Sequence, residues 1–168
     1  SREEFLQSRE DYELARELLD GYFQEIDGGA QPSSCHEDLL LYLAWVCYKD
    51  GDGSDAQSPH HNLRLAHDYL IDIGDDFDAY CDDSYMKLAE LYSACYTCYD
   101  DYDLKHVQRH RSRKWYGRKA YEYYSQAADE GFPMGMYYKA RFLIDGDVVE
   151  SDFNQAFMLL KESEEGGD

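Results

Sequence analysis

The chain has 168 residues, a formal net charge of −20, and a composition that is 43% hydrophobic and 15% aromatic. This apolar content is far above that of disordered acidic tails, so we expect a folded chain, and the length fits one domain better than two. The acidic balance opposes binding to nucleic acid or to an anionic membrane. It favours protein partners that have a basic or mixed surface.

The composition indicates an all-α fold, because only three prolines occur in a chain rich in helix-forming residues. In the N-terminal half, helices are predicted over residues 11–28, 36–51 and 62–73. Every residue from Leu39 to Tyr48 is apolar or aromatic, which predicts a helix that is covered on several faces. This run is about half as long as the ~20 residues of a membrane-spanning helix, so we expect no such helix.

Four further helices are predicted in the C-terminal half, over residues 84–98, 114–130, 133–145 and 152–165. Gly146 separates the last two helices, and Ser151 or Asp152 is expected to cap the final one. The connection formed by residues 99–114 is much longer than the link between the last two helices. It is therefore interpreted as an insertion, a place where partner contacts often occur.

The insertion contains most of a basic segment, residues 105–119, which has seven Lys or Arg and no Asp or Glu. The seven are Lys105, Arg109, Arg111, Arg113, Lys114, Arg118 and Lys119. Outside this segment, nine basic residues stand against all 36 acidic ones. The basic segment is either an internal counter-charge or a binding surface. As a binding surface it fits a short acidic peptide or protein patch better than RNA, because the rest of the chain repels a long polyanion.

The C-terminal half contains segments that resemble a known repeat family. AADEG at 127–131 and ESEEG at 162–166 lie 35 residues apart, a period typical of helix-hairpin repeats. KAYEYYSQAADEG at 119–131 resembles the second helix of the Sel-one-like repeat family, which is related to tetratricopeptide repeats. LAELY at 88–92 is similar to the core of its first helix, and FLIDGDVVESDFNQA at 142–156 is similar to its loop.

The resemblance covers residues 120–167 most closely and weakens toward the N-terminus, where Trp45 replaces a small residue of the family pattern. It implies a right-handed α-solenoid of about three helix-turn-helix repeats that follow an extra N-terminal helix. The repeats would span 36–74, 84–131 and 133–167 within a single domain, 1–168. The family also implies an adaptor or scaffold that binds another protein on the concave helical surface.

The abundant aromatic residues divide into two predicted groups. Tyr92, Tyr123 and Tyr124 stand at repeat positions and are expected to pack between helices. Others lie on the first helix of each repeat, which lines the concave face in the family, and are candidate partner-binding anchors. These are Tyr42, Trp45, Tyr85, Tyr96 and Tyr138.

One set of residues has a spacing that could suit a metal. Cys95, Cys98, His106 and His110 follow the pattern C-x2-C-x7-H-x3-H, in which a helical hairpin could bring four ligands to one zinc ion. The spacer in the middle is shorter than that of the usual zinc finger, and core packing explains a cysteine inside a helix. We therefore predict no metal and no cofactor.

No catalytic motif is present, neither a nucleophile elbow nor a phosphate loop nor a zinc-protease helix, so we predict a non-enzymatic protein. The alternative function is an acidic inhibitor that imitates nucleic acid in the basic cleft of a nuclease or DNA-binding protein. Five cysteines leave at least one thiol unpaired in a monomer. Cys35 and Cys47 would be ~18 Å apart on a shared helix, and the same argument separates Cys81 from Cys95, which favours reduced thiols and the cytoplasm. The first residues show no signal peptide, although secretion of a processed chain stays open, as does the oligomeric state.

Overall fold

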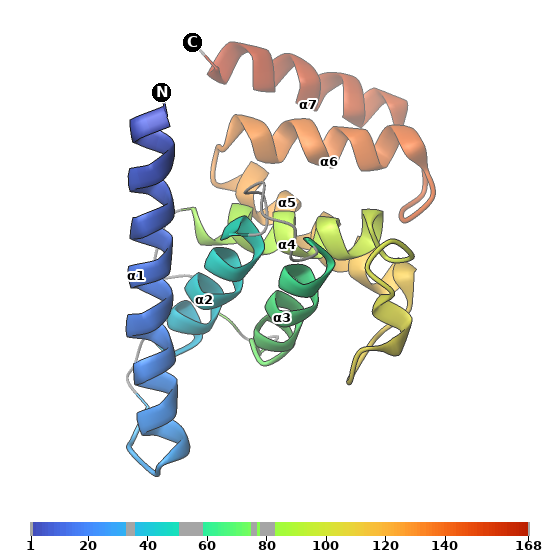
Figure 1. Cartoon of the computed structure of the whole chain (residues 1–168). Coiled ribbons are helices and arrows are strands. Elements are labelled where there is room, and N and C mark those ends of the chain that lie inside the picture. The colour runs from blue at the N-terminus through green and yellow to red at the C-terminus, as the bar shows by residue number, and fades with distance from the viewer. Residues whose placement is uncertain (1, 33–35, 51–58, 75–76, 78–82, 168) are drawn as a thin grey trace. The chain divides into compact units, whose positions relative to one another are not determined.

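The computed structural model describes residues 2–32, 36–50, 59–74, 77 and 83–167 (Figure 1). Within these ranges the chain forms seven α-helices and one short 3-10 helix, and no strand. The helices are α1 (Arg2–Asp27), α2 (His36–Asp50), α3 (Pro59–Ile71), α4 (Ser84–Thr97), η1 (Leu104–His106), α5 (Arg113–Asp129), α6 (Pro133–Asp145) and α7 (Phe153–Gly166). The all-α prediction is confirmed for this part of the chain.

The helices group into two compact units. The first unit holds α1, α2 and α3 together with Val107–Arg109, and the second holds α4, η1, α5, α6 and α7. In both units each helix packs against the next one along the chain. This packing is consistent with a helical repeat. The prediction of one domain with repeats at 36–74, 84–131 and 133–167 stays a prediction.

In the first unit, α2 lies between its neighbours in sequence and contacts both α1 and α3. Leu41, Leu43 and Ala44 of its long apolar run are completely buried, whereas Tyr42 remains 39% exposed. The expectation of a helix covered on several faces is therefore confirmed in part, because Leu39, Trp45 and Tyr48 are only half-buried. Helix α3 contributes Leu63 and other apolar residues to the same core.

In the second unit, the tyrosines expected to lie between helices do so. Tyr92, Tyr123 and Tyr124 are all buried. The rings of Tyr92 and Tyr123 are nearly parallel, with centroids 5.7 Å apart. Such an aromatic pair contributes ~0.5–1.5 kcal/mol beyond the burial of its area.

The ends of the helices follow local sequence signals. Helix α6 has the predicted bounds, with Pro133 in its first turn and Gly146 ending it at a φ of 67°, where a residue without a Cβ has no steric cost. Asp152 caps α7 by accepting a hydrogen bond from the backbone N of Gln155 at 3.0 Å. Helix α1 begins well before residue 11, so the predicted start was too late, because the polar stretch at 2–10 lacks an apolar period and yet continues the helix.

Helices α5 and α6 approach each other very closely at Gly135. A Cβ atom built on Gly135 would lie 2.8 Å from the backbone N of Ala128 and 2.9 Å from the Cβ of Ala127. The two helices can reach this separation only because Gly135 has no side chain and Ala127 has a small one. The rings of Tyr124 and Tyr138 stack across the same pair of helices, with centroids 4.8 Å apart.

Candidate functional site

Two of the five predicted anchor residues lie on α2 in the first unit. Tyr42 and Trp45 are three residues apart and therefore share one side of the helix. Tyr42 is exposed, and Trp45 is half-buried with its ring centroid 6.1 Å from that of Tyr48. Part of the aromatic surface of this pair is therefore accessible to solvent on α2, the helix on which the prediction placed it.

In the second unit, Tyr85 and Tyr138 are both half-buried and already have aromatic partners. Tyr85 on α4 stacks on Tyr123 with a centroid distance of 6.2 Å, and Tyr138 on α6 stacks on Tyr124. Packing inside the unit therefore accounts for an aromatic residue at each of these two positions, and no partner protein is needed to explain them. The part of each ring that stays exposed is held rigidly by the stack beneath it.

Tyr96 is held by several groups of its own unit. Its hydroxyl donates a hydrogen bond to Asp147 Oδ2 at 2.6 Å. The guanidinium of Arg113 lies over its ring at 4.4 Å from the centroid, while Arg113 Nε donates to the Tyr96 carbonyl at 3.0 Å. Lys114 Nζ lies 3.8 Å from Asp147 Oδ1. These contacts fasten the loop between α6 and α7 to the end of α4 and the start of α5.

The same contacts shift two acid–base equilibria. Burial raises the pKa of Tyr96, and the hydrogen bond to Asp147 raises it further. The pKa of Asp147 is lowered, first by the hydrogen bond from Tyr96 and then by the charge of Lys114. Between these two pKa values the bond joins a neutral phenol to a carboxylate, the arrangement in which it is strongest.

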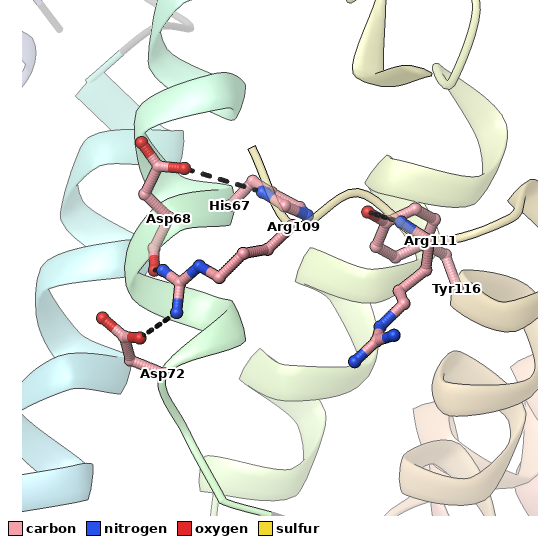
Figure 2. Close-up of polar contacts among 6 residues, drawn as sticks. All are labelled: His67, Asp68, Asp72, Arg109, Arg111 and Tyr116. Atoms are coloured by element: carbon pink, nitrogen blue, oxygen red, sulfur yellow. Dashed lines mark hydrogen bonds and ion pairs between the residues drawn. The ribbon is translucent and has the colours of Figure 1, made fainter. Parts of the chain in front are cut away.

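The basic segment divides between the two units, and Arg109 belongs to the first. Its backbone has a φ of 57°, a conformation that is rare for a residue other than glycine. Arg109 Nη1 lies 2.5 Å from Asp72 Oδ1, and Nη2 donates to the carbonyl of Asp68 at 3.3 Å (Figure 2). The hydrogen bond to Asp72 raises the pKa of Arg109. Arg109 thus places a cation at the C-terminal end of α3, where the helix dipole favours it.

Arg111 and the start of α5 form the next part of the basic segment. The backbone N of Arg111 donates to the hydroxyl of Tyr116 at 3.0 Å (Figure 2). The Arg111 guanidinium and the Lys119 ammonium lie 5.5 Å and 5.7 Å from the centroid of the Trp115 ring. Lys119 also lies 3.5 Å from Glu122. Burial raises the pKa of Tyr116 to about 12, so its hydroxyl stays protonated.

Two cations of the basic segment have neither an ion pair nor an aromatic contact among the described residues. These are Lys105 and Arg118, and both are exposed. The basic segment therefore serves partly as an internal counter-charge, through Arg109, Lys114 and Lys119, and partly as a charged surface.

The structure does not gather the residues of the zinc pattern into a site. Cys95 is completely buried in α4, and burial raises the pKa of its thiol. Cys98 follows the helix and is half-buried, His106 is exposed and pairs with Asp103 at 2.7 Å, and His110 is exposed. Among the described residues, no group of three or more His, Cys, Asp or Glu could hold a metal ion.

The sequence interpretation missed an exposed apolar surface on the last two helices. We call it the α6–α7 face, and it consists of Met134, Tyr137 and Ile144 of α6 and Phe153 and Phe157 of α7. Phe153 is 66% exposed and Phe157 is 70% exposed. The signal was present in the sequence as two phenylalanines four residues apart, and these were given no role.

Comparisons with known proteins add no constraint. No family model matches the chain, and neither a curated protein nor a solved structure is similar to it. Within the ranges that the structure covers, none of the helices combines the length and the apolar character needed to cross a membrane.

Proposed function

We propose that this protein is a non-enzymatic interaction scaffold of the Sel-one-like repeat type, a right-handed α-solenoid that binds a partner protein through its helical surface. The observation that supports this most is the exposure of Phe153 and Phe157 beside a well-filled interior. Large aromatic side chains that are rigidly mounted and left in water are typical of protein-binding surfaces. The proposed setting is the cytoplasm, in agreement with the free thiols of Cys95 and Cys98.

Two surfaces are available for the partner. The first is the predicted concave surface, on which Tyr42 is exposed and Trp45 is half-buried. The second is the α6–α7 face in the second unit. Tyr85, Tyr96 and Tyr138 would add contacts only through the ring edges left exposed by their packing.

The chain's charge favours a second candidate function, an acidic inhibitor that imitates nucleic acid. With 36 acidic and 16 basic residues, the protein would attract the basic cleft of a nuclease or a DNA-binding protein. The ion pairs of Arg109 and Lys114 with carboxylates of the same chain fit this alternative as well, because they neutralise part of the positive charge.

An affinity capture distinguishes these two functions. The purified chain is used as bait at low and at high salt, and bound proteins are identified by mass spectrometry. A scaffold keeps its partner at high salt, and loses it when Tyr42 and Trp45, or Phe153 and Phe157, are changed to alanine.

An inhibitor that acts by charge releases its partner as salt rises, and the aromatic variants have little effect. Far-UV circular dichroism of each variant serves as the control for folding. Release by salt together with indifference to both aromatic pairs would refute the scaffold function.

A further inference from the structure

We propose that the α6–α7 face binds an amphipathic helix of a partner protein, one that carries lysine or arginine beside its apolar stripe. This inference rests on the proposed function, because it names the chemistry of the partner at one of the two candidate surfaces. It is carried by the width of the apolar arc on α7, by the geometry of the α6–α7 hairpin, and by the charge of the surroundings.

Helix α7 is apolar over a wider arc than α6 covers. Ala156 is buried in a core that it shares with α6, and Leu159 and Leu160 pack against that core. Successive residues of a helix are ~100° apart, so Phe153 and Phe157 continue the same arc on one side. When the apolar arc of a helix is wider than the face that its neighbour covers, the helix typically packs against a second neighbour as well.

The exposed apolar residues of α6 lie on the same side of the hairpin. Met134, Tyr137 and Ile144 fall within ~80° of one another on α6, in an arc that also holds the exposed Arg141. This arc lies beside Ala140, which packs with Ala156. Since the loop between them is short, α6 and α7 run antiparallel (Figure 1). Seen from one end of the hairpin, successive residues therefore turn clockwise around one helix and anticlockwise around the other. The arc of α6 and the extra arc of α7 therefore point the same way.

The exposed row on α6, apolar except for Arg141, and the exposed apolar row on the adjacent antiparallel α7 together match the contact surface of one further helix. Packed helices lie ~8–10 Å apart, so a third helix laid between the rows can contact both. A partner helix would present apolar residues at spacings of three and four, the usual mode of helix recognition.

The charge around the α6–α7 face selects the partner's chemistry. From residue 133 to residue 167, which spans both helices and their loop, the chain has seven acidic residues and three basic ones, Lys139, Arg141 and Lys161. Glu162, Glu164 and Glu165 at the end of α7 are all exposed. A second copy of this chain would bring a further charge of −20 and would be repelled. Lysine or arginine along the flank of the incoming helix complements this rim.

The test uses three labelled synthetic peptides of about 18 residues, five helical turns. The first has leucines at helical spacing with lysines beside them, the second replaces every lysine by glutamate, and the third scrambles the leucines. Fluorescence anisotropy measures their affinity for the full chain. We expect the lysine peptide to bind most tightly, and Phe157→Glu to weaken it at least tenfold, as the loss of a central apolar contact does.

The matched control is Leu18→Glu on α1, because Leu18 is 68% exposed and Phe157 is 70% exposed. This variant introduces the same charge at an equally exposed apolar position and should keep the wild-type affinity. Phe157→Ala is a second variant that adds no charge, and it should also weaken binding. Positions 18 and 157 both lie on the surface, and circular dichroism of each variant verifies that the helices are intact.

Several outcomes would overturn the inference. It fails if no peptide binds, if the glutamate peptide binds as well as the lysine peptide, or if Leu18→Glu weakens binding as much as Phe157→Glu. It also fails if sedimentation shows a dimer that Phe157→Glu dissociates, since the occupant is then a second copy. If these peptides fail while the Tyr42 and Trp45 variants lose the captured partner, the proposed scaffold function stands and only this inference is refuted.

Discussion

Substitution of Gly135 by alanine tests the close packing of α5 and α6. In an ordinary helix interior, Gly→Ala raises stability by ~1 kcal/mol, because alanine has less backbone freedom to lose on folding. At Gly135 the new Cβ would lie 2.8 Å from the backbone N of Ala128, which is 0.6 Å short of the 3.4 Å where ordinary contact begins. Backbone cannot rotate away as a flexible side chain can, so the two helices must separate.

Such overpacking costs ~1–3 kcal/mol, and separating the helices also weakens the stack of Tyr124 on Tyr138. We therefore expect Gly135→Ala to lower the free energy of unfolding of the second unit by ~1–2 kcal/mol despite the gain in helix propensity. The matched control is Gly21→Ala in α1, where a Cβ meets nothing within 4 Å. There the same change should stabilise the first unit by ~0.5–1 kcal/mol.

Amide hydrogen exchange followed by mass spectrometry gives the stability of each unit separately, from peptides of α5 and α6 and from peptides of α1. Opposite signs for the two glycines are expected. If Gly135→Ala is as stable as the wild type, the close approach of α5 to α6 is wrong.

Three further predictions concern polar and reactive groups. The hydrogen bond between Tyr96 and Asp147 depends on pH, because the pKa of Asp147 is lower in the folded than in the unfolded protein. The bond stabilises the fold fully above the unfolded pKa of ~3.9, and this stabilisation is lost as pH falls through the folded pKa. Tyr96→Phe should reduce this acid-side dependence in urea titrations, leaving the smaller part that is due to the charges of Lys114 and Arg113. An unchanged profile would contradict the bond. Arg109→Gly should be ~1 kcal/mol more stable than Arg109→Ala, because both lose the cap of α3 but only glycine relieves the positive φ; equal stabilities would show that no strain is present. Maleimide should modify Cys98 in the native protein and leave Cys95 unmodified until it unfolds, since Cys95 is fully buried and its pKa is raised. Rapid labelling of Cys95 would show that α4 is not packed as described.

The sequence alone predicted the helices well, because the signals that begin and end a helix are local. Pro133 and Gly146 define α6 within their own neighbourhood, and Asp152 caps α7 through a residue three positions away. The burial of Tyr123 and Tyr124 was also predictable, since their positions in the helical period assign them to the interior. The start of α1 was not, because a polar helix lacks the apolar period on which the prediction depended.

The candidate surfaces depended on contacts between residues far apart in the chain. Tyr96 is a reasonable anchor in sequence, but Asp147, 51 residues later, holds its hydroxyl. The basic segment looks uniform, yet Arg109 caps α3 through Asp72, 37 residues earlier, while Arg118 stays in solvent. Charge and spacing show which groups can form ion pairs, and only the tertiary structure decides which of them meet, because many acidic residues are equally eligible.

The α6–α7 face shows the same division. The sequence determined that Phe153 and Phe157 share one side of a helix, because the helical period is fixed by backbone geometry. Whether that side is covered is a property of packing, and apolar residues in a helix are by default assigned to a core. The sequence thus determined which residues form each helix and which share a side. The tertiary structure decided which sides remain exposed to solvent, because exposure depends on the neighbours that the rest of the chain supplies.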